Sequence, residues 1–144
     1  MEVTKEEIER RFIEYNQLYF GGILKKPRCS TCRNKHFVGI FGYSGFTPDG
    51  EVISPSITID NDIDWDDTTL KDTILHEMIH YYITVTEHRS SGHGCSFRKI
   101  CKRLYDEYGI SVSVGGTYKL FRKCEKKTST KLSLMVAYIK HIFG

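Results

Sequence analysis

Two histidines and a glutamate in the middle of the chain have the spacing of a metal site. The segment His76-Glu77-Met78-Ile79-His80 lies within a stretch whose apolar residues recur at helical spacing. Side chains at positions i and i+4 of a helix lie one above the other, so both imidazoles can bind one ion and Glu77 can reach a water molecule on it. Zinc favours imidazole nitrogen, and a catalytic zinc site uses three protein ligands. The segment therefore predicts one zinc ion per chain and requires a third ligand.

Four residues that follow His80 are candidates for the third ligand. His93 is the best placed, because it follows at a distance that lets the chain turn back toward the helix. Glu87 and His88 follow the helix almost directly, so a short loop limits their reach. Glu107 lies near the far end of the next predicted helix. We therefore predict the zinc ligands His76, His80 and His93.

The residues around these histidines indicate a family. Metzincins carry Gly and His three and six residues after the second histidine, but here Ile83 and Thr86 occupy these positions. The segment 76–80, followed by His93-Gly94-Cys95-Ser96-Phe97, resembles the SprT-like metallopeptidases, whose signature is HExxH and then HGxxF at the start of the next helix. Residues 16–24, Asn-Gln-Leu-Tyr-Phe-Gly-Gly-Ile-Leu, are similar to the segment that this family carries after its first helix. The resemblance covers roughly residues 4 to 114.

The resemblance implies a zinc-dependent metalloendopeptidase in which Glu77 is the catalytic acid/base. Gly94 would let the loop pass close to the metal, and Phe97 would anchor the third helix in the core. Zinc would lower the pKa of water toward about 7, and Glu77 would take the water proton and later protonate the leaving amine. An oxyanion-stabilising group is also required. The sequence does not choose among the candidates Tyr82, His88, Arg89 and Tyr118.

Five scattered cysteines do not form the even framework of a secreted disulfide scaffold. Cys29 and Cys32 have the spacing of zinc ligands, but only Cys124 follows Cys101, so the second pair of a zinc ribbon is missing. Cys95 lies beside His93 and is left out of the predicted site. The acidic, polar N-terminus does not look like a signal peptide, and no apolar stretch is long enough to cross a membrane. We therefore expect a cytoplasmic protein without a membrane partner.

The second half of the chain is basic. Residues 1–72 carry nine Lys and Arg against thirteen Asp and Glu, whereas residues 73–144 carry twelve against five. This excess is a candidate surface for nucleic acid or another polyanion. The residues that could contact DNA are Arg98, Lys99, Lys102, Arg103, Lys119, Arg122, Lys123, Lys126, Lys127 and Lys131.

Three functions agree with these patterns. The first is a protease acting on DNA-associated or DNA-crosslinked proteins, which the resemblance implies through its Spartan-type members. The second is a protease dedicated to one regulatory protein partner. The third is a noncatalytic zinc or nucleic-acid-binding module in which the metal only stabilises the fold. Glu77 argues against this third function, because a structural zinc site needs no general base.

Three helices are predicted. Thr4 begins a capping box, and the apolar spacing after it predicts a helix over residues 5–20. The metal motif lies in a broadly apolar, largely buried helix over residues 69–84. Ser96 is the possible cap of a third helix that ends at Gly109.

Strands are predicted over residues 35–44, 51–60 and 110–114. Within the second, the part from Ser56 to Ile59 is expected to be a sheet edge that pairs with substrate backbone. The acidic loop over residues 60–67 lacks the Gly and Glu of an EF-hand, so its aspartates are expected to cap the next helix rather than bind calcium.

These elements predict an α+β fold of the zincin-like type, with a small, mainly antiparallel sheet packed on three helices and the HExxH motif on the central one. The length of 144 residues predicts a single domain with a core over about residues 4–114. Residues 115–144 form a basic C-terminal extension. In it, residues 118–121 could form a strand, and residues 132–143 either a strand or a short helix.

Overall fold

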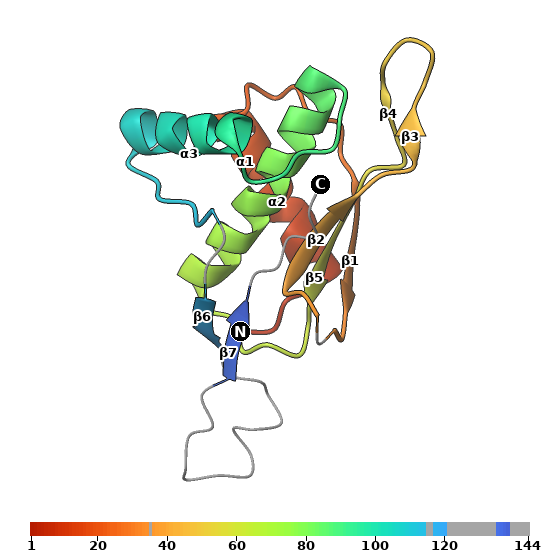
Figure 1. Cartoon of the computed structure of the whole chain (residues 1–144). Helices are drawn as coiled ribbons and strands as arrows, with labels where there is room; N and C mark the ends of the chain where they lie inside the picture. Colours follow the sequence, from red (N-terminus) through yellow and green to blue (C-terminus); the bar gives the residue numbers. More distant parts are fainter. Residues whose placement is uncertain (35, 115–116, 121–134, 139–144) are drawn as a thin grey trace, which may run out of the picture.

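A computed structural model describes residues 1–34, 36–114, 117–120 and 135–138 (Figure 1). The helices are α1 (Lys5–Tyr19), α2 (Asp67–Glu87) and α3 (Cys95–Tyr108). The strands are β1 (Arg28–Cys32), β2 (Gly39–Gly42), β3 (Gly45–Phe46), β4 (Val52–Ile53), β5 (Ser56–Asp60), β6 (Thr117–Leu120) and β7 (Met135–Tyr138). Helices α1 and α2 pack against the sheet, and α3 packs against α2 (Figure 1). The α+β class with three helices and a small sheet is therefore confirmed.

Side chains at the N-termini of α1 and α2 satisfy the backbone as predicted. The Thr4 hydroxyl accepts a hydrogen bond from the Glu7 N–H at 3.1 Å, and Asp66 accepts one from the Thr69 N–H at 2.7 Å. Each bond satisfies one of the N–H groups that a helix start leaves without an intrahelical partner. The acidic loop before α2 therefore supplies a helix cap, as expected.

The start of α3 differs from the prediction. Gly94, not Ser96, is the N-cap residue, and α3 begins at Cys95 without a side-chain cap. The Ser96 hydroxyl instead donates to Glu87 at 3.0 Å, so a contact with the end of α2 replaces the local cap. At the other end, Gly109 adopts the left-handed conformation (φ 70°) that terminates the helix, as predicted.

The three-stranded sheet has the order β1-β5-β2, with β1 parallel and β2 antiparallel to β5. The prediction that residues 56–59 form a sheet edge is therefore wrong, because β5 is hydrogen-bonded on both sides. Among the described residues, β2 is an edge of this sheet. The antiparallel prediction holds for the other strand pairs, whereas the parallel pairing comes from β1, a strand that the sequence did not predict.

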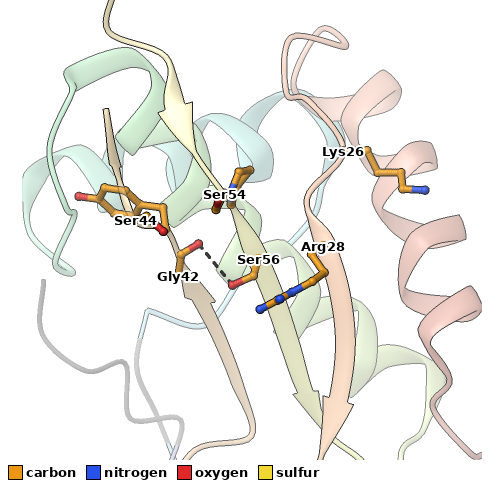
Figure 2. Close-up of a pocket in the computed structure, with 8 residues that line it drawn as sticks. Lys26, Arg28, Gly42, Ser44, Ser54 and Ser56 are labelled. Atoms are coloured by element: carbon orange, nitrogen blue, oxygen red, sulfur yellow. Dashed lines mark hydrogen bonds between the residues drawn. The ribbon is translucent and has the colours of Figure 1, made fainter. Parts of the chain in front are cut away.

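The two faces of this sheet have different surroundings. Ile57 and Ile59 are buried on the helix side, where Phe41 of β2 stacks on Tyr81 of α2. Alternation along the strands places Ser56 on the other face. A cavity of about 620 Å³ lies there, with Arg28 and Ser56 in front of the sheet and the helices behind it (Figure 2). This cavity therefore faces away from α2 and its histidines.

Helix α2 is surrounded by the other elements over most of its length. Residues 73–81 are all buried, and the Tyr81 ring also packs on Phe12 of α1. The buried central helix predicted from its broad apolar face is confirmed. No helix in the described part of the chain is both long enough and apolar enough to span a membrane.

The predicted strand over residues 110–114 is absent, and this segment is irregular. Its backbone bonds to side chains of α2 rather than to a strand. The Ser113 carbonyl accepts from His76, and the Ser113 N–H donates to Asp72. Beyond it, β6 and β7 pair antiparallel. Strand β6 agrees with the strand predicted near residues 118–121, and β7 shows a strand within 132–143. The rest of the predicted extension lies outside the described residues.

Candidate metal centre

Three imidazole nitrogens converge at the contact between α2 and α3. The Nε2 atom of His76 lies 3.2 Å from that of His80 and 3.0 Å from that of His93, and the last two lie 3.1 Å apart. A tetrahedral zinc ion with Zn–N bonds of about 2.0–2.1 Å spaces its ligands about 3.3–3.4 Å apart. These three residues could therefore hold a metal ion, and the donor set fits zinc.

The hydrogen bond at the other nitrogen of His76 fixes its tautomer. Nδ1 lies 2.6 Å from the carbonyl oxygen of Ser113. A carbonyl oxygen only accepts hydrogen bonds, so Nδ1 carries the proton and Nε2 presents its lone pair. His76 is thus oriented as a metal ligand requires.

A hydrogen bond to Ser91 fixes the tautomer of His80 in the same way. Nδ1 of His80 lies 2.9 Å from the hydroxyl oxygen of Ser91, and that hydroxyl donates its one proton to the Gly92 carbonyl at 3.0 Å. The Ser91 oxygen therefore accepts from Nδ1–H, which leaves the lone pair of His80 on Nε2. Ser91 is itself buried, so this bond is shielded from water.

Phe97 forms an apolar floor beneath the three histidines. It is fully buried, and its ring centroid lies 4.6, 4.9 and 5.0 Å from the rings of His76, His80 and His93. Phe97 therefore anchors α3 in the core, as the family resemblance implies, and also keeps one side of the cluster dry.

Glu77 is buried between α2 and β2. Burial raises the pKa of its carboxyl group to about 8, while His80 and a backbone hydrogen bond from Phe41 act in the opposite direction. A Cβ atom at Gly39 would lie 3.5 Å from Glu77 Cγ and only 2.8 Å from Thr73 Cγ2. Gly39 therefore allows β2 to pass close over α2 at Glu77.

The 88–94 loop carries Ser91 and His93, and several contacts hold it. His88, in the left-handed conformation (φ 54°), caps α2 with its N–H on the Thr84 carbonyl at 3.0 Å. Glu87 accepts hydrogen bonds from Arg89 at 2.9 Å and from Ser96 at 3.0 Å, which joins the two ends of the loop. The position of His93 is thus set by the network at the end of α2 and the start of α3.

The other candidate ligands lie elsewhere. Glu87 is bonded to Arg89 and Ser96, and the His88 ring lies 3.2 Å from the Gly50 carbonyl. In the described part of the chain, the three histidines form the one group of three or more residues that could bind a metal, and Glu107 is not in it. Of the candidates for oxyanion stabilisation, Arg89 pairs with Glu87, and Tyr82 packs on Phe20. The side chain of Tyr118 lies outside the described residues.

The cysteines are separate from this cluster. The described cysteines Cys29, Cys32, Cys95 and Cys101 are free thiols. Cys29 and Cys32 are three residues apart on β1, so they point to opposite faces of the strand and cannot bind one ion together. Burial raises the pKa of Cys29 to about 11, which keeps it protonated. Cys124 lies outside the described residues.

Several basic residues of α3 are engaged within the molecule. Arg103 donates to the Tyr19 carbonyl at 2.8 Å, and its guanidinium lies over the Phe20 and Tyr82 rings. Arg98 donates to the His93 carbonyl at 3.2 Å, and Lys102 pairs with Asp106. The Arg103 and Arg98 contacts position α3 and the 88–94 loop, whereas the Lys102–Asp106 pair is an exposed pair within α3. Of the remaining predicted DNA contacts, Lys99 is exposed on α3. The side chains of Lys119, Arg122, Lys123, Lys126, Lys127 and Lys131 lie outside the described residues.

Sequence reasoning missed the groups that orient the histidines. Asp72, His76 and His80 recur every four residues, so Asp72 was visible on the face of the two ligands. Its partner is a backbone N–H 41 residues away, and no residue type marks such a partner. The role of Ser91 likewise depends on the loop conformation rather than on a motif.

The fold and the three-histidine cluster define an α+β protein that could bind a metal ion on its central helix. The family model described as the SprT-like family matches residues 8–116, and the chain therefore belongs to this family. Neither a curated protein nor a solved structure matches the chain. The family match covers all three histidines and the Ser113 segment.

Proposed function

We propose that this chain is a zinc-dependent metalloendopeptidase of the zincin-like type. The observation that carries the proposal is the convergence of three Nε2 atoms within 3.2 Å of one another, with the Nδ1 atoms of His76 and His80 already occupied by hydrogen bonds. That combination is what zinc requires of neutral imidazole ligands. The residues that would hold the ion are His76, His80 and His93.

Glu77 is the proposed catalytic acid/base. When bound, zinc would lower the pKa of water toward about 7 and polarise a peptide carbonyl. The carboxyl group of Glu77 takes one proton from the attacking water and gives it to the leaving amine, so the residue ends the reaction as it began. The raised pKa of Glu77, which burial brings to about 8, suits a group that must both accept and release a proton near neutral pH.

Strand β2 is the proposed docking edge for substrate backbone. It is an edge of the described sheet, and Gly39 brings it close to Glu77. An extended peptide can add to such an edge through main-chain hydrogen bonds. This placement replaces β5, whose backbone is already paired on both sides. A side chain at position 39 would push the docked peptide away from Glu77.

Zinc content and proteolysis of four variants test the proposal. Purified wild-type protein should hold one zinc ion per chain and cleave a casein-type substrate. His93→Ala should lose the zinc, while Glu77→Gln should keep it and lose cleavage. The matched controls are His36→Ala and Glu107→Gln, which replace exposed residues and should change neither quantity. Normal zinc binding by His93→Ala would overturn the ligand set. Full activity in Glu77→Gln would overturn its role.

Action on DNA-associated or DNA-crosslinked proteins is the finer part of this proposal. It rests on the basic second half of the chain and on the family. Because Arg98, Lys102 and Arg103 make contacts within the molecule, alanine replacements are best placed at Lys119, Arg122, Lys123, Lys126 and Lys127. Salt-dependent binding of single-stranded DNA that these replacements weaken would support the proposal. Cleavage that ignores DNA would favour a protease dedicated to one protein partner. Zinc binding without any cleavage would favour a noncatalytic module.

A further inference from the structure

One residue of the 110–114 segment is bonded to α2 through both of its backbone groups. The Ser113 N–H donates to Asp72 Oδ1 at 2.8 Å, and the Ser113 carbonyl accepts from His76 Nδ1 at 2.6 Å. Asp72 and His76 are four residues apart on the buried helix, so they present two groups about one helical turn apart. The backbone of Ser113 therefore spans one turn of α2 between a carboxylate and a predicted zinc ligand.

We propose that Asp72 is a positioning residue for His76 and acts through the backbone of Ser113. This inference rests on the proposed zinc site. The acceptor oxygen of Asp72 sets where Ser113 lies along α2, and the Ser113 carbonyl then sets the ring orientation and tautomer of His76. Partners in this position keep a ligand nitrogen aimed at the ion and commonly contribute about 10–100-fold to metal affinity.

The surroundings of Ser113 support a role for this bond. The 110–114 segment makes no strand pairing with the described residues, so it depends on point contacts. Val112 is buried in the core, and the Ile110 N–H bonds to the Leu104 carbonyl at 3.3 Å. Among the groups that hold this segment, Asp72 lies nearest to His76 in the sequence. It bonds to Ser113, the residue whose carbonyl accepts the hydrogen bond from His76.

The environment of Asp72 makes the inference testable by substitution. Asp72 is partly exposed and lines an open cavity of about 550 Å³ together with Leu75, Ile110 and Ser113. Water can enter such an open cavity and satisfy the Ser113 N–H when the carboxylate is removed. Replacement of Asp72 should therefore loosen the segment without unfolding α2.

Three substitutions separate the position of the acceptor from its charge. Asp72→Ala removes the acceptor and should weaken zinc binding measurably, by at most the about 10–100-fold typical of groups bonded directly to a ligand. Asp72→Asn keeps an oxygen in the same place without the charge, and its affinity should stay near the wild-type value. Asp72→Glu keeps the charge but moves the oxygen by one methylene, and it should bind zinc more weakly than Asp72→Asn. Asp106→Ala, an exposed aspartate on α3, is the control. Competition against a chromophoric chelator measures the affinities.

A second readout uses the zinc-free protein. In the wild type, ¹⁵N spectra of the histidine rings should show His76 with its proton on Nδ1. Asp72→Ala should shift this ring toward a mixture of tautomers, and Asp72→Asn should restore it. Unchanged zinc affinity in Asp72→Ala, or an affinity of Asp72→Glu above that of Asp72→Asn, would overturn the inference. A wild type that binds no zinc would overturn the proposed function instead, and the spectra would still decide the role of Asp72.

Discussion

His76 and His80 lie on a buried helix, whereas His93 lies in a partly exposed loop, and the two regions hold their histidines by different means. On α2, the helix fixes the backbone, and one hydrogen bond per ring sets the orientation. In the 88–94 loop, the backbone itself must be held, and Glu87, Arg89 and Ser96 do so from both ends. The loop ligand therefore depends on polar surface contacts for the position of its backbone, whereas α2 itself supplies that position for the other two ligands.

The largest effect is expected where the two regions meet, at Phe97. Its fully buried ring contacts all three imidazoles, so Phe97→Ala should lower the free energy of unfolding by about 3–5 kcal/mol through the cavity it leaves. Chemical denaturation of the zinc-free protein measures this loss. The control is Tyr105→Ala, which removes an exposed ring from the same helix and should change the stability by less than about 0.5 kcal/mol. Equal effects of the two substitutions would contradict the packing role of Phe97.

The next largest loss of stability is expected where β2 packs against α2. Gly39→Ala places a Cβ 2.8 Å from Thr73 Cγ2 and 3.2 Å from Ile59 Cδ1, so β2 must move away from α2. We expect a loss of about 1–3 kcal/mol in the free energy of unfolding and a lower kcat, since Glu77 lies under this contact.

A glycine in the other region sharpens the contrast. A Cβ on Gly94 would meet no protein atom within 4 Å, so close packing of the described residues does not explain the glycine that the family resemblance places near the metal. Gly94→Ala should therefore leave the stability of the zinc-free protein almost unchanged. A Gly94→Ala loss as large as that of Gly39→Ala would show that the loop is packed as tightly as the helix.

A smaller effect is expected from the contacts that hold the loop. Arg89→Ala removes an exposed partner of Glu87, so the free energy of unfolding should fall by less than about 1 kcal/mol. Zinc affinity should also fall, because the loop that carries His93 loses a contact. The fall should be smaller than the about 10–100-fold typical of groups bonded directly to a ligand. The control is Arg10→Ala, which breaks exposed ion pairs on α1 and should leave zinc affinity unchanged. An identical zinc affinity in Arg89→Ala and wild type would show that the contacts of Arg89 do not help to position His93.

The smallest effect is a pH dependence at the same network. The Ser96 hydroxyl, and then Arg89, hold the pKa of Glu87 below its ordinary value of 4.5. A lowered pKa in the folded state stabilises the protein above pH 4.5, and this contribution is lost as the pH falls through the lowered value. The Tm difference between wild type and Glu87→Gln should therefore be steady near pH 6–7 and shrink in acid. A difference that stays unchanged at pH 3 would contradict this role.

Much of the site could be predicted from the sequence because its residues follow helical spacing. The helix fixes where His76 and His80 point, and the short connection to α3 limits the position of His93. Helix caps were predictable for the same reason, since Thr4 and Asp66 each accept from an N–H group three residues away. Features that depend on local geometry could therefore be predicted from the sequence.

Features that depend on partners distant in the sequence could not be predicted in this way. Strand β1 has one β-branched residue and no apolar alternation, and it forms because β5 pairs with it. Missing β1 led to the wrong assignment of β5 as an edge. The same limit applies to residues 110–114, whose apolar residues suggested a strand but whose backbone bonds to side chains of α2. At Ser96, a contact with Glu87 replaced the local cap.

The place of Glu77 between α2 and β2 also bears on the order of assembly. The three histidines lie within eighteen residues of sequence, two on a helix and one in the loop that follows it. Glu77 instead needs β2, which precedes it by more than thirty residues and is positioned through β5. Contacts of short sequence separation form earlier in folding than distant ones. We therefore expect the three histidines of a newly made chain to meet before β2 covers Glu77, although the Ser113 bond that orients His76 also joins distant residues and forms later. Under the proposed function, the chain would then gather its zinc ligands before Glu77 is in place, which would delay proteolysis until the sheet is complete.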